Sequence, residues 1–136
     1  MPGYSGTPLP KKLGIKPGFC VAIDEAPPEV RAELKAALAE CTTSPGLKKS
    51  VDFMMLFTKS KEDLGNIEEL KHLVKQLTPA GMLWISWPKK SSGVPTDLTE
   101  NIIREIGLAA GLVDVKVCAV TDVWSGLKFV RRLKDR

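Results

Sequence analysis

Lysine and hydroxyl side chains gather in the segment 87–93, which reads WPKKSSG. Lys89 and Lys90 supply ammonium groups, Ser91 supplies a hydroxyl, and a helix is expected to begin shortly after them. Ammonium groups, hydroxyls and the free backbone N–H groups of a helix start are the donors that bind anions. The segment therefore predicts a site for a small anionic ligand. The alternative is a solvated loop with no ligand.

Thr96 and Asp97 stand at the expected start of that helix. Asp97 is followed three residues later by Glu100, the spacing of a capping box. Both Thr96 and Asp97 are good helix caps, and a cap needs no further role. We therefore keep two interpretations of this pair, as part of the anion site or as caps alone.

Carboxylates mark the ends of two other expected strands. Asp24 follows the first strand and Asp122 follows the fourth. Ligands in open parallel sheets bind beyond the carboxyl ends of the strands, so the two could act as an acid and a base. These strands are expected to lie several positions apart, and no catalytic residue is assigned.

Lysines of the N-terminal arm and two tryptophans complete the candidates. Lys11 and Lys12 could fold across a pocket, whereas tryptophans in strands usually pack in a core or an interface. The predicted ligand-binding residues are Lys11, Lys12, Asp24, Trp87, Lys89, Lys90, Ser91, Thr96, Asp97, Asp122 and Trp124.

The cysteines and the one histidine do not support a metal site or a nucleophile. Cys20, Cys41 and Cys118 form no Cys-x-x-Cys pair, and His72 lies on the charged side of its expected helix. Zinc requires about four clustered thiolate or imidazole ligands. We predict no metal and no Cys–His or Ser–His–Asp catalysis. Reduced thiols fit the cytoplasm.

Composition indicates a globular domain. The chain has 136 residues, of which 43% are hydrophobic and 26% are charged, near the averages for folded proteins. The longest apolar run spans residues 53–57, far short of the roughly 20 residues of a membrane helix. Residues 1–18 lack the apolar core of a signal peptide. We expect a soluble cytoplasmic protein without a membrane partner.

The basic residues lie mainly at the two ends of the chain. Residues 1–18 hold three lysines and no acid, and residues 123–136 hold five basic side chains and one acid. Such ends could contact RNA, DNA or an acidic protein. No run of four basic residues and no arginine–aromatic alternation occurs, so nucleic acid is an unlikely partner.

Strand and helix patterns alternate after residue 18. Residues 1–18, with four Gly and four Pro, are predicted to be an arm too broken for a helix, and residues 19–136 a single domain. The strands are predicted at 19–23, 51–57, 82–87, 114–122 and 127–133. The helices are predicted at 28–41, from Lys61 or Asn66 to Leu77, and from Asp97 to Gly111, with turns at 42–50 and 124–126.

The order β-α-β-α-β-α-β-β predicts a Rossmann-like α/β domain of two or three layers. Its sheet has about five mostly parallel strands, and the last strand is antiparallel. Right-handed crossovers that progress one way place all three helices on one face. The strands are nevertheless apolar on both faces, so the second face is predicted to be covered by the arm, by a second copy in a homodimer, or by both.

The order resembles the C-terminal half of a class I methyltransferase. Residues 13–18 (LGIKPG) look like the approach to the first strand of such an enzyme, and the ending with Trp124-Ser125-Gly126 is similar. The resemblance implies S-adenosylmethionine as cofactor. A nucleoside-binding turn needs glycines, however, and residues 24–28 (DEAPP) contain none. We therefore expect no cofactor.

Several longer motifs resemble the bacterial Domain of Unknown Function 3052 family. They are GYSGTPL at 3–9, KKLGI at 11–15, WISWPK at 84–89, TDLTE at 96–100 and WSGLKF at 124–129. The resemblance spans nearly the whole chain and implies a small cytoplasmic protein without an assigned activity.

Three functions stay open from the sequence. The first is a non-catalytic binding or interaction module for a small anion or a protein partner. The second is a degenerate methyltransferase-like enzyme with Asp24, Asp97 or Asp122 as base. The third is weak nucleic-acid binding through the basic ends.

Overall fold

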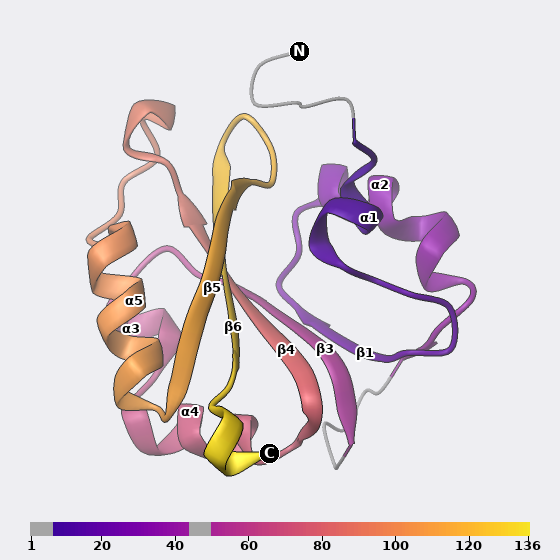
Figure 1. Ribbon diagram of the computed structural model, residues 1–136. Helices are drawn as coiled ribbons and strands as arrows, with labels where there is room; N and C mark the ends of the chain where they lie inside the picture. Colours follow the sequence, from indigo (N-terminus) through magenta and orange to yellow (C-terminus); the bar gives the residue numbers. More distant parts are fainter. Residues whose placement is uncertain (1–6, 44–49) are drawn as a thin grey trace.

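A mostly parallel sheet lies between two layers of helices in the computed structural model, which describes residues 7–43 and 50–136 (Figure 1). The strands are β1 (Cys20–Asp24), β2 (Thr42–Thr43), β3 (Val51–Phe57), β4 (Leu77–Pro88), β5 (Leu112–Ala119) and β6 (Trp124–Arg131). The helices are α1 (Leu9–Leu13), α2 (Pro28–Leu38), α3 (Lys61–Leu64), α4 (Ile67–Val74) and α5 (Glu100–Ala109), with short 3-10 turns at Lys90–Ser92 and Leu133–Asp135. The predicted α/β class and the antiparallel last strand are confirmed.

The strand order is β2-β1-β3-β4-β6-β5 in the described residues. β2, β1, β3 and β4 pair in parallel, and β6 is antiparallel to both β4 and β5. The two-residue strand β2 lies within the segment that we predicted to be a turn. It brings the sheet from the expected five strands to six.

This short strand also corrects the predicted placement of the helices. From β1 the chain moves outward through α2 to β2, whereas α4 and α5 carry it the opposite way across the sheet. Right-handed crossovers in opposite directions place their helices on opposite faces. α1 and α2 therefore cover one face and α3, α4 and α5 the other (Figure 1).

Two apolar cores result, one on each face. Met54, Leu83 and Phe129 pack beneath α4 and α5. Phe53 and Trp84, which point to the other face, pack beneath α1 and α2. Alternate residues of a strand point to opposite faces, so an apolar sequence on both faces reflects this double coverage.

The N-terminal arm contains a helix, which corrects the prediction that it is too broken for one. α1 begins with Pro10 in its first turn, where the missing N–H costs nothing, and ends at Gly14 with φ 91°. Its Leu9 and Leu13 are buried against the sheet. α1 and α2 thus cover part of the face for which the arm and a second copy were considered.

Two segments between β3 and β4 differ from the prediction of one helix ending at Leu77. Gly65, with φ 87°, separates α3 from α4, and Ser60 and Asn66 cap the two helices separately. β4 already begins at Leu77, because the pairing with β3 shifts register and accommodates Pro79 outside the regular ladder.

The tryptophan of the predicted turn at 124–126 instead begins β6. The turn lies at 120–123, where the backbone N–H groups of Val120 and Thr121 both donate to the carbonyl oxygen of Trp124. Gly126 serves close packing, since a Cβ there would lie 2.9 Å from Val120 Cγ2. β5 correspondingly ends at Ala119.

The cap of α5 is Thr99, which corrects the prediction of Asp97 and Glu100 as a capping box. The Thr99 hydroxyl accepts a hydrogen bond from the backbone N–H of Ile102. α2 ends at Leu38, three residues before the predicted end. None of the helices in 7–43 and 50–136 combines the length and apolar character needed to cross a bilayer.

Candidate functional site

A cleft of about 740 Å³ opens at the carboxyl ends of β1 and β3. The crossovers leave these neighbouring strands in opposite directions, which makes the position the topological switch point where open α/β sheets bind ligands. The cleft is lined by Asp24, Glu25, Pro27, Phe57, Thr58, Lys59, Asp63 and Trp124.

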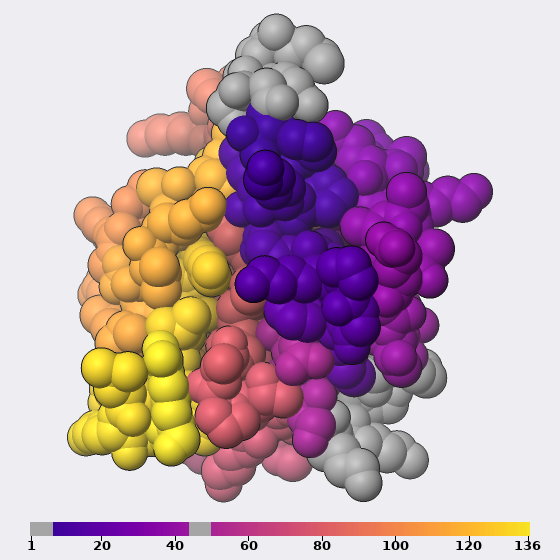
Figure 2. Space-filling view, turned by 45° about the vertical axis from the view of Figure 1, so that its right-hand side comes forward, coloured from indigo at the N-terminus to yellow at the C-terminus, as the bar shows by residue number. Residues whose placement is uncertain are grey.

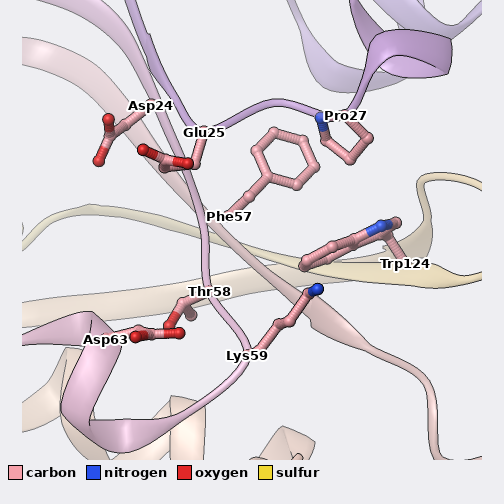
Figure 3. Close-up of a pocket in the computed structure, with 8 residues that line it drawn as sticks. All are labelled: Asp24, Glu25, Pro27, Phe57, Thr58, Lys59, Asp63 and Trp124. Carbon is pink, nitrogen blue, oxygen red and sulfur yellow. The ribbon is translucent and has the colours of Figure 1, made fainter. Parts of the chain in front are cut away.

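Acidic and aromatic groups occupy opposite sides of this cleft (Figure 3). The carboxylates of Asp24, Glu25 and Asp63 lie on one side, and the two aromatic rings with the lysine lie on the other. The charged side chains that line it are therefore three acids and one base. This arrangement favours a ligand with a positive charge and an apolar surface.

The aromatic side is built by two strands that run in opposite directions. Phe57 ends β3, while Trp124 begins β6 and is paired with Pro88 at the end of β4. The two rings meet edge to face, with centroids 5.3 Å apart and an interplanar angle of 79°. Such a pair is a stable, preorganised wall.

Hydrogen bonds within 58–63 hold the loop that follows β3. The hydroxyl of the buried Thr58 donates to the carbonyl oxygen of Ser60 at 2.9 Å. The Ser60 hydroxyl in turn accepts from the backbone N–H of Asp63 at 3.0 Å, which starts α3. This cap places the Asp63 carboxylate beside the cleft.

Thr96 and Asp97 support the same loop from behind. The Thr96 hydroxyl donates to the carbonyl oxygen of Lys59 at 2.6 Å, and Asp97 Oδ1 accepts from the backbone N–H of Lys61 at 3.0 Å. These two predicted ligand-binding residues do not line the cleft, but they fix the segment that does.

A second cavity of about 600 Å³ adjoins the first and shares Asp24, Phe57, Thr58 and Asp63 with it. It adds Glu68, Glu69 and His72 from α4. Asn66 donates from its side-chain amide to Glu69 at 3.0 Å, and Lys71 pairs with Glu68 at 3.7 Å. The extension is thus also rich in carboxylates.

The turn after β1 does not fit the backbone cradle that a nucleoside cofactor needs. Glu25 adopts φ 62°, a conformation that glycine takes without strain, yet it carries a side chain that lines the cleft. Pro27 and Pro28 have no N–H to donate. The residues of this turn therefore do not fit the usual backbone cradle for S-adenosylmethionine.

Of the predicted ligand-binding residues, Asp24 and Trp124 line the cleft. Asp122 does not, because it is exposed on the turn between β5 and β6, and β3 and β4 separate it from Asp24. Lys11 and Lys12 lie on α1 above the sheet face.

The predicted anion site at 87–93 is not part of the cleft. Trp87 is buried in the core under α4 and α5. Lys89 donates its backbone N–H to Val123, and Lys90 and Ser91 are exposed on the following 3-10 turn. The serine hydroxyl that closes this turn belongs to Ser92, which donates to the Lys89 carbonyl oxygen at 2.6 Å.

Sequence reasoning did not select six of the eight residues that line the cleft. Thr58 and Lys59 directly follow the second strand, so the strand-end position was a usable signal for them, as it was for Glu25 after the first. Asp63 gave no such signal, because the break at Gly65 that creates α3 was not expected. In 7–43 and 50–136, no three His, Cys, Asp or Glu side chains gather to hold a metal ion.

Solved methyltransferases share this fold at low sequence identity. A SAM-dependent methyltransferase from Aquifex aeolicus superposes with a TM-score of 0.67 at 15% identity, covering 88% of this chain and 85% of that chain. A putative type 11 methyltransferase from Sulfolobus solfataricus gives 0.59 at 18% identity, with 91% and 89% covered. The magnesium protoporphyrin IX methyltransferase from Synechocystis with bound SAM gives 0.52 at 15%, with 91% and 74% covered.

No curated protein matches the chain. The family described as "Protein of unknown function (DUF3052)" matches residues 11–133. This range contains every element except the start of α1 and the last residues of the chain. The chain belongs to this family of unknown function and has a methyltransferase-like fold.

Proposed function

We propose that the protein is a non-catalytic binding module that holds a small organic cation in the cleft at the ends of β1 and β3. One observation carries the proposal: three carboxylates, of Asp24, Glu25 and Asp63, line the same cleft as the rings of Phe57 and Trp124 (Figure 3). A carboxylate binds an ammonium or sulfonium group by charge, and an aromatic face adds a cation–π contact.

The ligand class differs from the anion that the sequence suggested, because the lysines at 89 and 90 lie outside the cleft. The cleft volume of about 740 Å³ is in the range of small-molecule sites. The cytoplasmic location is part of the same proposal, and it is supported by three cysteines that are all free thiols in the described residues.

Titration calorimetry with spermidine and choline tests the proposal. We expect binding of at least one of them to the wild-type protein, and at least tenfold weaker binding to Asp24→Asn and Asp63→Asn, because each variant removes one charge from the cleft. Asp122→Asn is the matched control, since it removes the same charge from an exposed turn. Equal weakening by all three variants, or no binding of either amine, would overturn the proposal.

Titrations with S-adenosylmethionine and S-adenosylhomocysteine test the alternative that the protein is a methyltransferase-like enzyme. The methyltransferase-like fold and the location of the cleft at the switch point favour this alternative. The sulfonium of the first is positive, whereas the thioether of the second is neutral. Recognition of the cation alone predicts that only the first binds. Equal binding of both, insensitive to Asp24→Asn, would support a retained cofactor site and an enzyme.

A further inference from the structure

The sheet face that carries α1 and α2 is only partly covered over β5 and β6. In Figure 1 these two helices stand beside β1 and β3, and neither of them lies over β5 and β6. Figure 2 shows the N-terminal segment in indigo next to β5 and β6 in orange and yellow. The open area lies apart from the cleft, and its chemistry is opposite.

Two lysines face each other across the open strands. Lys116 on β5 is the register partner of Lys128 on β6, which in turn is opposite Trp84 on β4. Side chains opposite each other in an antiparallel pair have Cβ atoms about 5 Å apart. Since Trp84 belongs to the core under α1, this row points to the open face.

The N-terminal segment brings a third lysine to the row. The Trp84 indole N–H donates to the carbonyl oxygen of Leu13 at 2.9 Å, in a buried hydrogen bond. The backbone continues past Met82, since a Cβ on Gly14 would lie 3.3 Å from the Met82 sulfur. Lys16 follows two residues later and is exposed.

The electrostatics show that these groups act on one another. Desolvation lowers the pKa of Lys128 most, and the positive charges of Lys116 and Lys16 lower it further. Burial raises the pKa of the neighbouring Cys118 thiol, and the positive charges of Lys12 and Lys116 act in the opposite direction and lower it. Lys16 and Lys128, one from each basic end of the sequence, thus lie close enough for their charges to interact.

We propose that Lys16, Lys116 and Lys128 form a binding site for a phosphate group of a small phosphorylated ligand. Like charges opposite each other destabilise the folded protein, and a bound dianion turns that repulsion into attraction. A dianion matches several ammonium groups better than a carboxylate does. Lys116 and Lys128 stand side by side as one register pair, whereas a nucleic acid backbone requires contacts spread along successive phosphates.

Inorganic pyrophosphate is the probe, measured by titration calorimetry on the full chain. We expect binding that weakens as salt is added, and at least tenfold weaker binding to Lys128→Gln and Lys116→Gln. Lys75→Gln is the control, because this exposed lysine ends α4 on the opposite side of the sheet. Its affinity for pyrophosphate should equal that of the wild-type protein.

Stability measurements separate a loss of the site from a loss of the fold. Removing one of two facing charges should leave the thermal midpoint of Lys116→Gln equal to or above that of the wild type. A single-stranded oligonucleotide is the second ligand. Pyrophosphate binding that is absent, or equal in Lys128→Gln and wild type, would overturn the proposal. So would tight oligonucleotide binding that pyrophosphate does not displace.

Discussion

The two faces of β6 differ in what covers them and in the residues that they carry. Leu127 and Phe129 are almost completely buried beneath the α5 side. Trp124, Gly126 and Lys128 alternate with them and point to the side of α1, where the cleft opens at one end of the strand and the lysines meet farther along. One strand thus contributes to a sealed core and to both proposed binding sites.

The comparison suggests that residues beneath a helix mainly stabilise the fold, whereas residues that no helix covers are available for binding. The crossover between β4 and β5 places α5 over one face of β6, whereas the N-terminal segment, bonded to Trp84 on β4, covers the other face only in part. Changes on the sealed face should therefore reduce the free energy of unfolding. Changes at Lys116 and Lys128 on the open face should alter binding at little cost in stability.

The largest effect is expected at the contact that seals the first face. A Cβ added at Gly107 on α5 would lie 2.0 Å from Phe129 Cε1. Gly107→Ala should lower the free energy of unfolding by about 3 kcal/mol, since overpacking in a core outweighs the better helix propensity of alanine. Urea denaturation measures it. Leu108→Ala, at the next and exposed position, is the control with little effect.

A smaller loss is expected where the N-terminal segment is fixed beside the open face. Trp84→Phe removes the indole N–H that bonds to the Leu13 carbonyl and should cost about 2 kcal/mol. Amide exchange in residues 9–15 should become faster. Trp87→Phe alters the other core and should leave that exchange unchanged. Unchanged exchange in Trp84→Phe would show that the bond does not hold the segment.

A gain in stability is expected at the cleft. Glu25→Gly relieves a left-handed conformation and should stabilise the protein by up to about 1 kcal/mol, while weakening cation binding through the loss of a carboxylate. Ser50→Gly relieves the same kind of conformation, φ 52°, and Ser50 is not among the residues that line the cleft. It should stabilise the protein without affecting binding. If both variants bound spermidine and choline equally well, the Glu25 carboxylate would have no part in cation binding.

The smallest effect is the pH dependence of the open face. The pKa of Lys128 is lowered from 10.5, so the unfolded chain binds more protons between the two values and stability rises with pH there. The facing groups are the ammoniums of Lys116 and Lys16. Lys128→Met should abolish this rise in urea denaturation at alkaline pH. Lys134→Met, at an exposed position near the C-terminus, should retain it.

Cys118 should act in the opposite direction. Its pKa is raised from 9.0 by burial, so the folded protein retains the proton longer and stability falls with rising pH in that window. Cys118→Ala should therefore reduce this loss of stability at alkaline pH. Identical alkaline profiles for Lys128→Met and Cys118→Ala would contradict both assignments.

The strands with apolar residues on both faces were predictable, because a short apolar run bounded by turn residues is typical of a buried strand. β3 was predicted with its correct bounds, and the antiparallel last strand followed from the short connection before it. Element ends were less accurate where tertiary contacts intervene. Pro79 reads as a helix stop in sequence but is tolerated in β4 beside a register shift.

The sequence by itself determined the α/β class, the order of the main elements and the absence of glycine after β1, since these depend on local periodicity and residue type. Only the tertiary structure decided which face each helix covers, because the two-residue β2 reverses the crossover. It likewise decided that Asp24 and Trp124 line one cleft and that Lys16 lies close enough to Lys128 to lower its pKa. The residues of each pair are about 100 positions apart in the chain. The order of the strands brings them together, and local sequence patterns do not determine that order.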